Sequence, residues 1–245
     1  MNTTNSKIPE SPWKGVYTFG AAAALLIAVV YLVEMVLVIT TGLPPDNVAA
    51  WFALFQADRT LGVLKSFSLD ILATACSTLM FLALYAALRK SVKSAWGLIL
   101  ALVLAFIGLA VYFSSNITFS MLSLSDQYAA ATTDAQRAAV MAAGQAMLAV
   151  FNGTGPFMAF LLNAVAGIII SVLMLQSRTF SRLTAWLGII GNALELGLPP
   201  GIAPAFFLKI DPVLIGIGGL LLIFWYLLIA QKLFRLERLE QQVLS

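Results

Sequence analysis

Histidine is missing from this sequence altogether, and cysteine occurs only once, at Cys76. The lack of histidine excludes His-ligated haem, His-based zinc sites, serine or cysteine nucleophiles activated by histidine, and the usual proton shuttle. A single cysteine forms neither a disulfide within the chain nor a thiolate metal cluster. The sequence therefore predicts no metal, no cofactor and no catalytic residue of these classes.

Charge is also scarce, because only 10% of the 245 residues are charged while 61% are hydrophobic. Soluble domains carry roughly a quarter charged residues. This chain cannot cover its surface with charge, so lipid must surround most of it. The net charge of +3 is not gathered into a basic patch with stacking aromatics, which excludes nucleic acid as a partner.

Long apolar runs dominate what remains. A membrane helix needs about 20 mostly apolar residues to cross roughly 30 Å. Six segments qualify: residues 16–41, 61–88, 95–120, 155–175, 183–208 and 213–233. No long soluble segment separates them. We therefore expect an all-α, polytopic membrane bundle forming a single domain over residues 1–245, with the six spans in 15–236 and short tails at 1–14 and 237–245.

The basic residues are distributed unequally between the two sides of such a bundle. With six spans both tails share one side, and that side holds ten of the fourteen Lys and Arg residues. The positive-inside rule then places both termini in the cytoplasm. The four basic residues on the other side are Arg59, Lys65, Arg137 and Lys209.

The outer connections are predicted to contain short interfacial helices. Asp46 is placed to cap a helix whose Trp51, Phe52 and Phe55 suit the membrane interface. In the second outer connection, Thr133 and Gln136 have capping-box spacing, and apolar residues follow with helical periodicity.

We interpret that second segment as an amphipathic helix that lies on the outer membrane surface or caps the bundle. The residues at 153–156 would separate it from the fourth span. The alternative is a simple extension of the fourth span.

The second span carries the strongest polar pattern. Ser66, Asp70, Thr74 and Ser77 are spaced four, four and three residues apart, which places them on one helix face. Arg59 is expected just above that face. Charged side chains in the bilayer are costly and normally face the bundle interior or a wet cavity.

Polar residues of five spans fall at similar depths, in the middle or outer half of the membrane, while the cytoplasmic halves are almost wholly apolar. We therefore predict a ligand pocket between the helices, open toward the outer face above an apolar plug. Its candidate residues are Glu34, Lys65, Asp70, Asn116, Asn163, Asn192 and Glu195, supported by Arg59, Ser66, Thr74 and Ser77. Pro199, Pro200, Gly201 and Pro204 would interrupt the fifth span at the mouth of the pocket.

The polar residues in the spans can also be explained by a purely structural role instead of ligand binding. Asparagine, serine and threonine in membrane helices often only bridge helices, at roughly 0.6 kcal/mol each, and glycines permit close packing. Lys65 could snorkel to the surface. The acids could form buried pairs with Arg59 or Lys65. Three acids against two bases do not cancel, however, so one acid would be protonated, exposed to water or bound to a cationic ligand.

Two stretches carry a resemblance to a known family. "GIIGNALELGLP" at 188–199 followed by "FWYLLIAQKLFRL" at 224–236, and the pattern of Arg59, Gly62, Asp70, Tyr85 and Arg89, resemble the bacterial integral-membrane family catalogued as domain of unknown function 4386. The likeness covers about residues 15–236. It implies a six-span protein of the bacterial cytoplasmic membrane and implies no activity.

Three functions remain open at this point. The first is binding, sensing or transport of a small, cationic or amphipathic ligand or lipid from the outer side. The second is a structural or accessory subunit whose polar residues only order the bundle. The third is an intramembrane enzyme that uses paired carboxylates for acid–base catalysis. No recognised sequence motif supports this third function. Membrane lipids are the one partner that composition itself implies.

Overall fold

The structure is a computed structural model that describes residues 15–93, 95–196 and 212–244, and within these ranges it consists of ten α-helices without strands. The all-α prediction is confirmed. Five helical stretches are long and apolar enough to cross a membrane. They comprise α1 (Val16–Thr41), α4 (Ser68–Leu88), a stretch that includes α5 (Trp96–Ser115), a stretch that includes α8 (Thr154–Gln176), and most of α10 (Pro212–Leu244).

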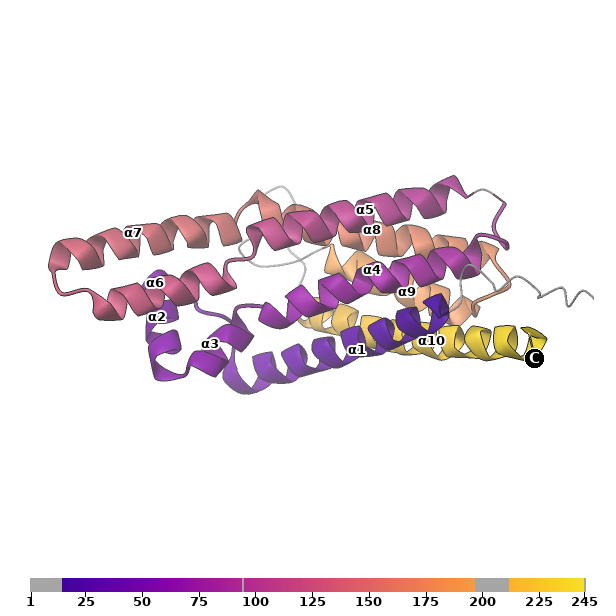
Figure 1. The fold of residues 1–245 in the computed structure, drawn as a ribbon, viewed down its shortest axis with the longest axis horizontal. Helices are drawn as coiled ribbons and strands as arrows, with labels where there is room; N and C mark the ends of the chain where they lie inside the picture. The colour runs from indigo at the N-terminus through magenta and orange to yellow at the C-terminus, as the bar shows by residue number, and fades with distance from the viewer. Residues whose placement is uncertain (1–14, 94, 197–211, 245) are drawn as a thin grey trace, which may run out of the picture.

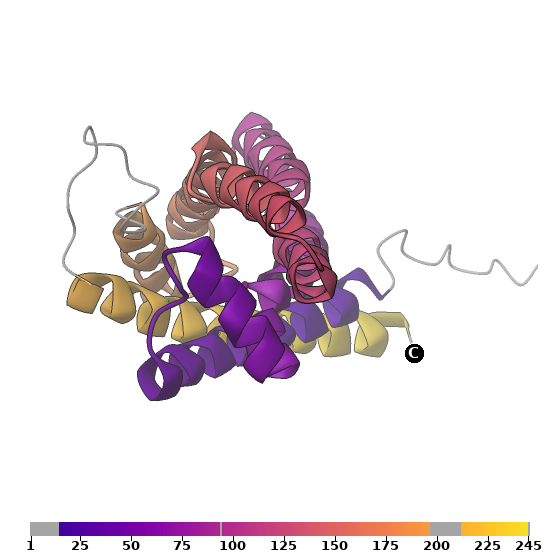
Figure 2. The same ribbon diagram turned by 90° about the vertical axis from the view of Figure 1, so that its left-hand side faces the viewer.

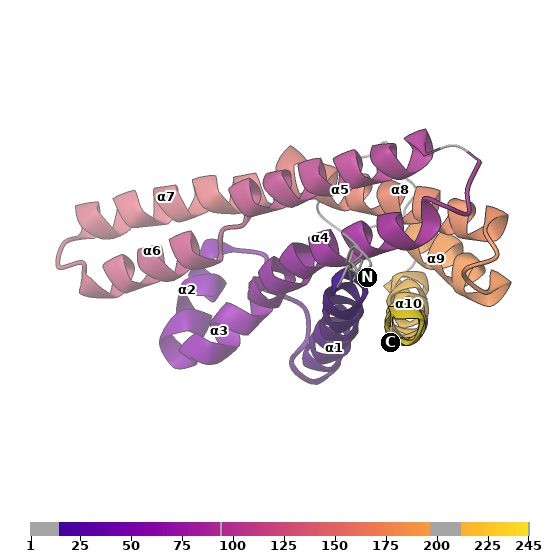
Figure 3. The same ribbon diagram turned by 45° about the vertical axis from the view of Figure 1, so that its right-hand side comes forward.

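These five helices and the shorter α9 (Arg182–Glu195) pack against one another as a closed ring; Figures 1 and 3 show them from two sides. Around the ring the order is α1, α4, α5, α8, α9 and α10, and α10 packs against α1 again. The predicted fifth span corresponds to α9, which is 14 residues long. Most of the rest of that span, with Pro199, Pro200, Gly201 and Pro204, lies outside the described residues.

An apolar core fills the ring and includes side chains with no exposed surface, such as Leu84, Leu88, Leu98 and Leu233. Large apolar side chains also cover the outside of the ring, for example Leu32 and Val103, which are about half exposed. A soluble protein would not present so many apolar side chains to water. The apolar exterior therefore suits a lipid environment.

A second apolar cluster lies beyond one end of the ring. It is built by α2 (Val48–Ala57), α3 (Arg59–Lys65), α6 (Thr118–Ala130) and α7 (Asp134–Phe151). Helices α6 and α7 form an antiparallel pair, the α6–α7 hairpin, that projects from the ring (Figure 1), and α2 and α3 lie beside it (Figure 2). The start of α1 and the end of α10 both lie at the opposite end of the ring.

The predicted helix in the second connection is confirmed as α7, with its capping box. The Gln136 backbone N–H donates to Thr133 Oγ1 at 3.2 Å, and the Thr133 N–H donates to Gln136 Oε1 at 3.2 Å. The helix does not lie flat across the ring. It continues the direction of α8 after a break at Asn152 and Gly153, so the alternative of an extended fourth span is closer to the observed arrangement.

The prediction for the first connection needs two corrections. Asn47, not Asp46, caps α2, because its extended backbone lets Oδ1 accept the Ala50 N–H at 2.9 Å. Trp51, with Phe52 and Phe55, is buried inside the second cluster rather than exposed on the helix surface. These rings hold α2 against the hairpin.

The predicted second span is interrupted. Helix α3 ends at Lys65 and α4 begins at Ser68, because Phe67 adopts a left-handed conformation with φ 58°. Two hydroxyl groups bind the carbonyl oxygens freed by this break. Tyr112 Oη donates to Phe67 O at 2.9 Å, and Thr118 Oγ1 donates to Ser66 O at 2.8 Å. These bonds offset the loss of helical hydrogen bonds.

The predicted third span also ends early. Helix α5 stops at Ser115, Asn116 follows as its C-cap, and the chain resumes as α6 at Thr118. Ser120 consequently does not continue the face of Tyr112 and Asn116, and it is exposed on α6. The sixth span runs further than predicted, because α10 remains helical to Leu244 through most of the expected tail.

Candidate functional site

Two adjoining cavities lie inside the ring, on the side of the α6–α7 hairpin. The inner cavity has a volume of about 60 Å³ and the hairpin-side cavity a volume of about 170 Å³. They adjoin because the same five side chains line both. Those side chains are Tyr31, Asp70, Tyr112, Phe160 and Glu195. We call this shared region the junction.

Six of the seven predicted pocket residues line these cavities. Glu34 and Asn116 line the hairpin-side cavity, Asn163 and Asn192 line the inner cavity, and Asp70 and Glu195 line both. Of the supporting residues, Thr74 and Ser77 line the inner cavity. The structure thus brings together polar groups from α1, α4, α5, α8 and α9, while their binding of a ligand stays a prediction.

Lys65 and Ser66 do not reach the cavities. The ammonium group of Lys65 donates to Thr41 O at 2.8 Å, at the end of α1. Ser66 is buried against the second apolar cluster. The break at Phe67 is the physical reason, because it separates both residues from the α4 face that carries Asp70. The predicted four-residue stripe is therefore wrong at its first member.

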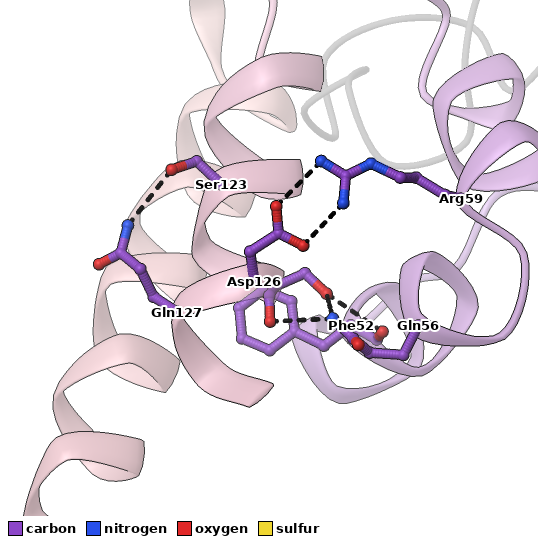
Figure 4. Close-up of polar contacts among 7 residues, drawn as sticks. Phe52, Gln56, Arg59, Ser123, Asp126 and Gln127 are labelled. Atoms are coloured by element: carbon purple, nitrogen blue, oxygen red, sulfur yellow. Dashed lines mark hydrogen bonds and ion pairs between the residues drawn. The ribbon is translucent and has the colours of Figure 1, made fainter. Parts of the chain in front are cut away.

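Arg59 is also engaged elsewhere. Its guanidinium donates to both carboxylate oxygens of Asp126 on α6, each at 3.0 Å (Figure 4). Nearby, Gln56 Nε2 donates to Ser125 Oγ at 2.9 Å, which further ties α2 to α6. The suggested buried pair of an acid with Arg59 or Lys65 is therefore wrong.

The three acids therefore line the cavities without a lysine or arginine partner among the residues that the structure describes. Glu34 and Asp70 are close enough to interact, and Asp70 also interacts with Glu195. No Lys or Arg in the described part of the chain forms an ion pair with any of them. Glu34 Oε1 is fully enclosed and has no hydrogen-bond partner. Enclosed carboxyl groups without a counter-charge are costly unless a proton, water or a ligand accompanies them.

The asparagines use their amide N–H groups within their own helices. Asn163 Nδ2 donates to Ala159 O at 2.9 Å, and Asn192 Nδ2 donates to Gly188 O at 2.7 Å. Neither forms a hydrogen bond to a neighbouring helix in the described structure.

Glycines on the neighbouring helices make room for these two amides. A Cβ atom at Gly108 would lie 2.5 Å from Asn163 Nδ2, and one at Gly167 would lie 2.7 Å from Asn192 Nδ2. Glycines therefore permit close helix packing beside the cavities, as predicted. Each glycine lets a polar side chain pack closely at a helix crossing.

Sequence reasoning missed the aromatic lining. Tyr31, Phe160, Trp225 and Tyr226 all line the inner cavity, and the rings of Tyr31 and Tyr226 meet edge to face with centroids 5.5 Å apart. One signal was present, because Tyr31 precedes Glu34 by three residues and so shares its helix face. Trp225 Nε1 is buried without a hydrogen-bond partner.

The cavities are lined by carboxyl groups, amides and aromatic rings. Carboxyl groups, amides and aromatic rings attract cations and accept hydrogen bonds, whereas Cys76 lines neither cavity. Within the described ranges, no three Asp, Glu, Cys or His side chains are grouped so as to hold one metal ion.

Comparisons with protein-family models, with curated proteins and with solved structures found no match.

Proposed function

We propose that this chain is a membrane protein that binds a small cationic ligand in the two adjoining cavities. The observation that carries the proposal is the group formed by Glu34, Asp70 and Glu195, which line these cavities without a basic partner in the described structure. A bound cation would supply the missing counter-charge. The cavity volumes of about 60 and 170 Å³ leave space for such a ligand.

The proposed setting is a bacterial cytoplasmic membrane, crossed six times, with both termini in the cytoplasm. The ring of six helices supports this count if residues after Glu195 complete the fifth span. Eight of the eleven described Lys and Arg residues lie at the ring end away from the hairpin, which supports a cytoplasmic position for that end. Membership of the family catalogued as domain of unknown function 4386 remains part of the proposal.

Sensing fits better than transport. The cavities lie on the hairpin side, and fully buried leucines such as Leu88 and Leu98 fill the ring toward the other end. A transporter needs alternating access from both sides. A ligand that enters from the hairpin side would meet a closed apolar core, as expected for a binding or sensing protein.

The test is ligand-induced thermal stabilisation of the purified full chain against a panel of small cations and neutral molecules. At least one cation should raise the melting temperature of the wild type. Asp70→Asn and Glu195→Gln should reduce this shift, because each removes a charge from the cavities. Asp126→Asn is the matched control, since Asp126 pairs with Arg59 outside them.

Two results would contradict the proposal. One is that no member of the panel stabilises the wild type. The other is an equal shift in the wild type and in both cavity variants. Uptake into vesicles that contain the protein would separate transport from sensing, because a sensor binds the stabilising cation without accumulating it.

A structural or accessory subunit is the second candidate, and a feature of α10 favours it. Gly216 is exposed, and no atom of the described residues lies within 4 Å of the position of its missing Cβ. Val213, Leu214 and Ile217 beside it are also exposed. Small and apolar residues on one helix suit packing against another membrane helix. A partner that co-purifies in fixed ratio with the wild type, and does not co-purify with Gly216→Leu, would support this role.

A further inference from the structure

The composition of the junction between the two cavities is more specific than a cluster of acids. Its five side chains comprise two carboxyl groups, from Asp70 and Glu195, and three aromatic rings, from Tyr31, Tyr112 and Phe160. They come from five different helices around the ring. A group placed at the junction therefore meets negative charge and aromatic surface from several directions at once.

Aromatic rings and carboxylates attract the same kind of partner. The face of an aromatic ring is negative, so it binds ammonium groups, most strongly where water is excluded. The hydroxyl of Tyr112 is already bonded to Phe67 O at 2.9 Å, and its ring meets Phe160 edge to face at 6.1 Å. These contacts fix two of the three rings before any ligand arrives, which lowers the entropic cost of binding.

The hairpin-side cavity provides space for an apolar body next to the junction. Phe67, Phe151, Pro156 and Phe160 contribute to its lining, and the rings of Phe67 and Phe151 stack with centroids 5.9 Å apart. Its volume of about 170 Å³ is comparable to an engineered apolar cavity of about 150 Å³ that binds benzene. A body of the size of one aromatic ring therefore fits.

Inorganic cations match the site less well. Calcium and magnesium need six or more oxygen ligands around one point, and aromatic rings cannot replace them. The acids of the described structure are not grouped to hold one metal ion. Rings near the charge and apolar space beside it are instead the features of sites for organic ammonium groups.

Two enclosed polar atoms also lack partners at this site. Glu34 lines the hairpin-side cavity, and its enclosed Oε1 forms no hydrogen bond with the described residues. Trp225, which is 1% exposed and lines the inner cavity, has an unpaired Nε1. Buried polar groups normally form hydrogen bonds, so both atoms remain available to a ligand or water in the cavities.

We propose that the ligand is a small organic ammonium compound, held with its ammonium group at the junction between Asp70 and Glu195 and its apolar body in the hairpin-side cavity. This inference rests on the proposed function and narrows it to one chemical class. Water fills the inner cavity beside the ammonium group, because 60 Å³ with polar lining accommodates a few water molecules.

Calorimetric titration of the full chain in lipid nanodiscs tests the inference with three probes. Phenethylammonium carries both charge and ring, 2-phenylethanol carries the ring without the charge, and ammonium chloride carries the charge without the ring. We expect phenethylammonium to bind at least about tenfold more tightly than either of the others, because only it uses both the acids and the rings.

Two variants separate the roles of rings and charge. Phe160→Leu keeps the cavity apolar but removes a ring from the junction, and should weaken phenethylammonium binding about three- to tenfold. Phe113→Leu is the matched control, because Phe113 is 46% exposed on the outside of α5. Glu195→Gln should weaken binding of phenethylammonium several-fold more than binding of 2-phenylethanol, which carries no charge.

The wild-type titrations keep the test decisive even if a variant fails to fold. Equal binding of 2-phenylethanol and phenethylammonium would overturn the inference and leave the cavities as a site for neutral ligands. Equal binding of ammonium chloride and phenethylammonium would overturn it in favour of a simple cation. Absence of binding by all three probes would overturn it as well, while the wider panel of cations decides the proposed function separately.

Discussion

Replacing Gly20 by alanine tests how closely α1 and α4 approach one another. A Cβ atom at Gly20 would lie less than 3.0 Å from the Cβ of Ala83 and 3.3 Å from Leu79 O. Two carbon atoms touch at about 3.5–4.0 Å, so the helices would have to separate. Overpacking of this kind costs about 1–3 kcal/mol.

The same crossing determines the position of the acids. Glu34 lies fourteen residues beyond Gly20 on α1, and Asp70 lies thirteen residues before Ala83 on α4. With a rise of about 1.5 Å per residue, both acids lie about 20 Å from the crossing toward the hairpin. The close approach at Gly20 therefore sets the register that brings Glu34 beside Asp70.

Thermal unfolding of the detergent-solubilised protein measures the effect. A loss of 1 kcal/mol shifts the melting temperature of a chain of this size by about 2–4 °C. Gly20→Ala should therefore melt several degrees below the wild type, and Ala83→Gly added to it should restore part of the loss. Gly216→Ala is the control, because no atom in the described part of the chain lies within 4 Å of its Cβ position.

Two outcomes would refute this reasoning. One is a Gly20→Ala variant as stable as the Gly216→Ala control. The other is a double variant in which the two substitutions simply add, since residues that touch show coupling energies of about 0.5–3 kcal/mol. Either result would mean that α1 and α4 do not cross at these residues.

Three further predictions concern other parts of the fold. Gly167→Ala should cost about 1–3 kcal/mol in thermal unfolding, because its Cβ would lie 2.7 Å from Asn192 Nδ2; unchanged stability would contradict the α8–α9 crossing. Thr133→Ala should remove about 1 kcal/mol of capping and speed hydrogen exchange in the first turn of α7, whereas unchanged exchange would argue against the capping box. Arg59→Ala should cost less than about 1 kcal/mol, and less still in high salt, because its pair with Asp126 is exposed; a larger, salt-independent loss would be inconsistent with that pair.

Long apolar runs made much of the helical fold predictable. The predicted first span, 16–41, has the same bounds as α1, because one uninterrupted apolar segment ends at Gly42. The capping box of Thr133 and Gln136 was also visible, since both partners lie within one turn. Both features depend on residues that are close together in the sequence, so the sequence alone reveals them.

The break at Phe67 could not be predicted in the same way. No glycine or proline marks it, and the hydroxyl groups that stabilise it belong to Tyr112 and Thr118, far along the chain. The pairing of Arg59 with Asp126 likewise depends on tertiary packing, because the two residues are far apart in the sequence. The supporting roles of Arg59 and Ser66 failed because they depended on a continuous helix.

The candidate site was predictable in its polar members and not in its aromatic ones. Asp70 and Glu195 stand out in an apolar segment because charge is costly there. Phe160 and Tyr31 do not, because an aromatic residue in an apolar helix can face lipid, core or cavity equally well. Only the packing of the six helices in the structure shows that these two side chains line the junction.

An experimental density map of the full chain in lipid nanodiscs, prepared with phenethylammonium, tests the central claim most directly. We expect density for a ring-sized ligand in the hairpin-side cavity, with its charged end within hydrogen-bonding distance of Asp70 and Glu195. A map in which a lysine or arginine of the chain pairs with these carboxyl groups, and the cavity holds no ligand, would contradict it.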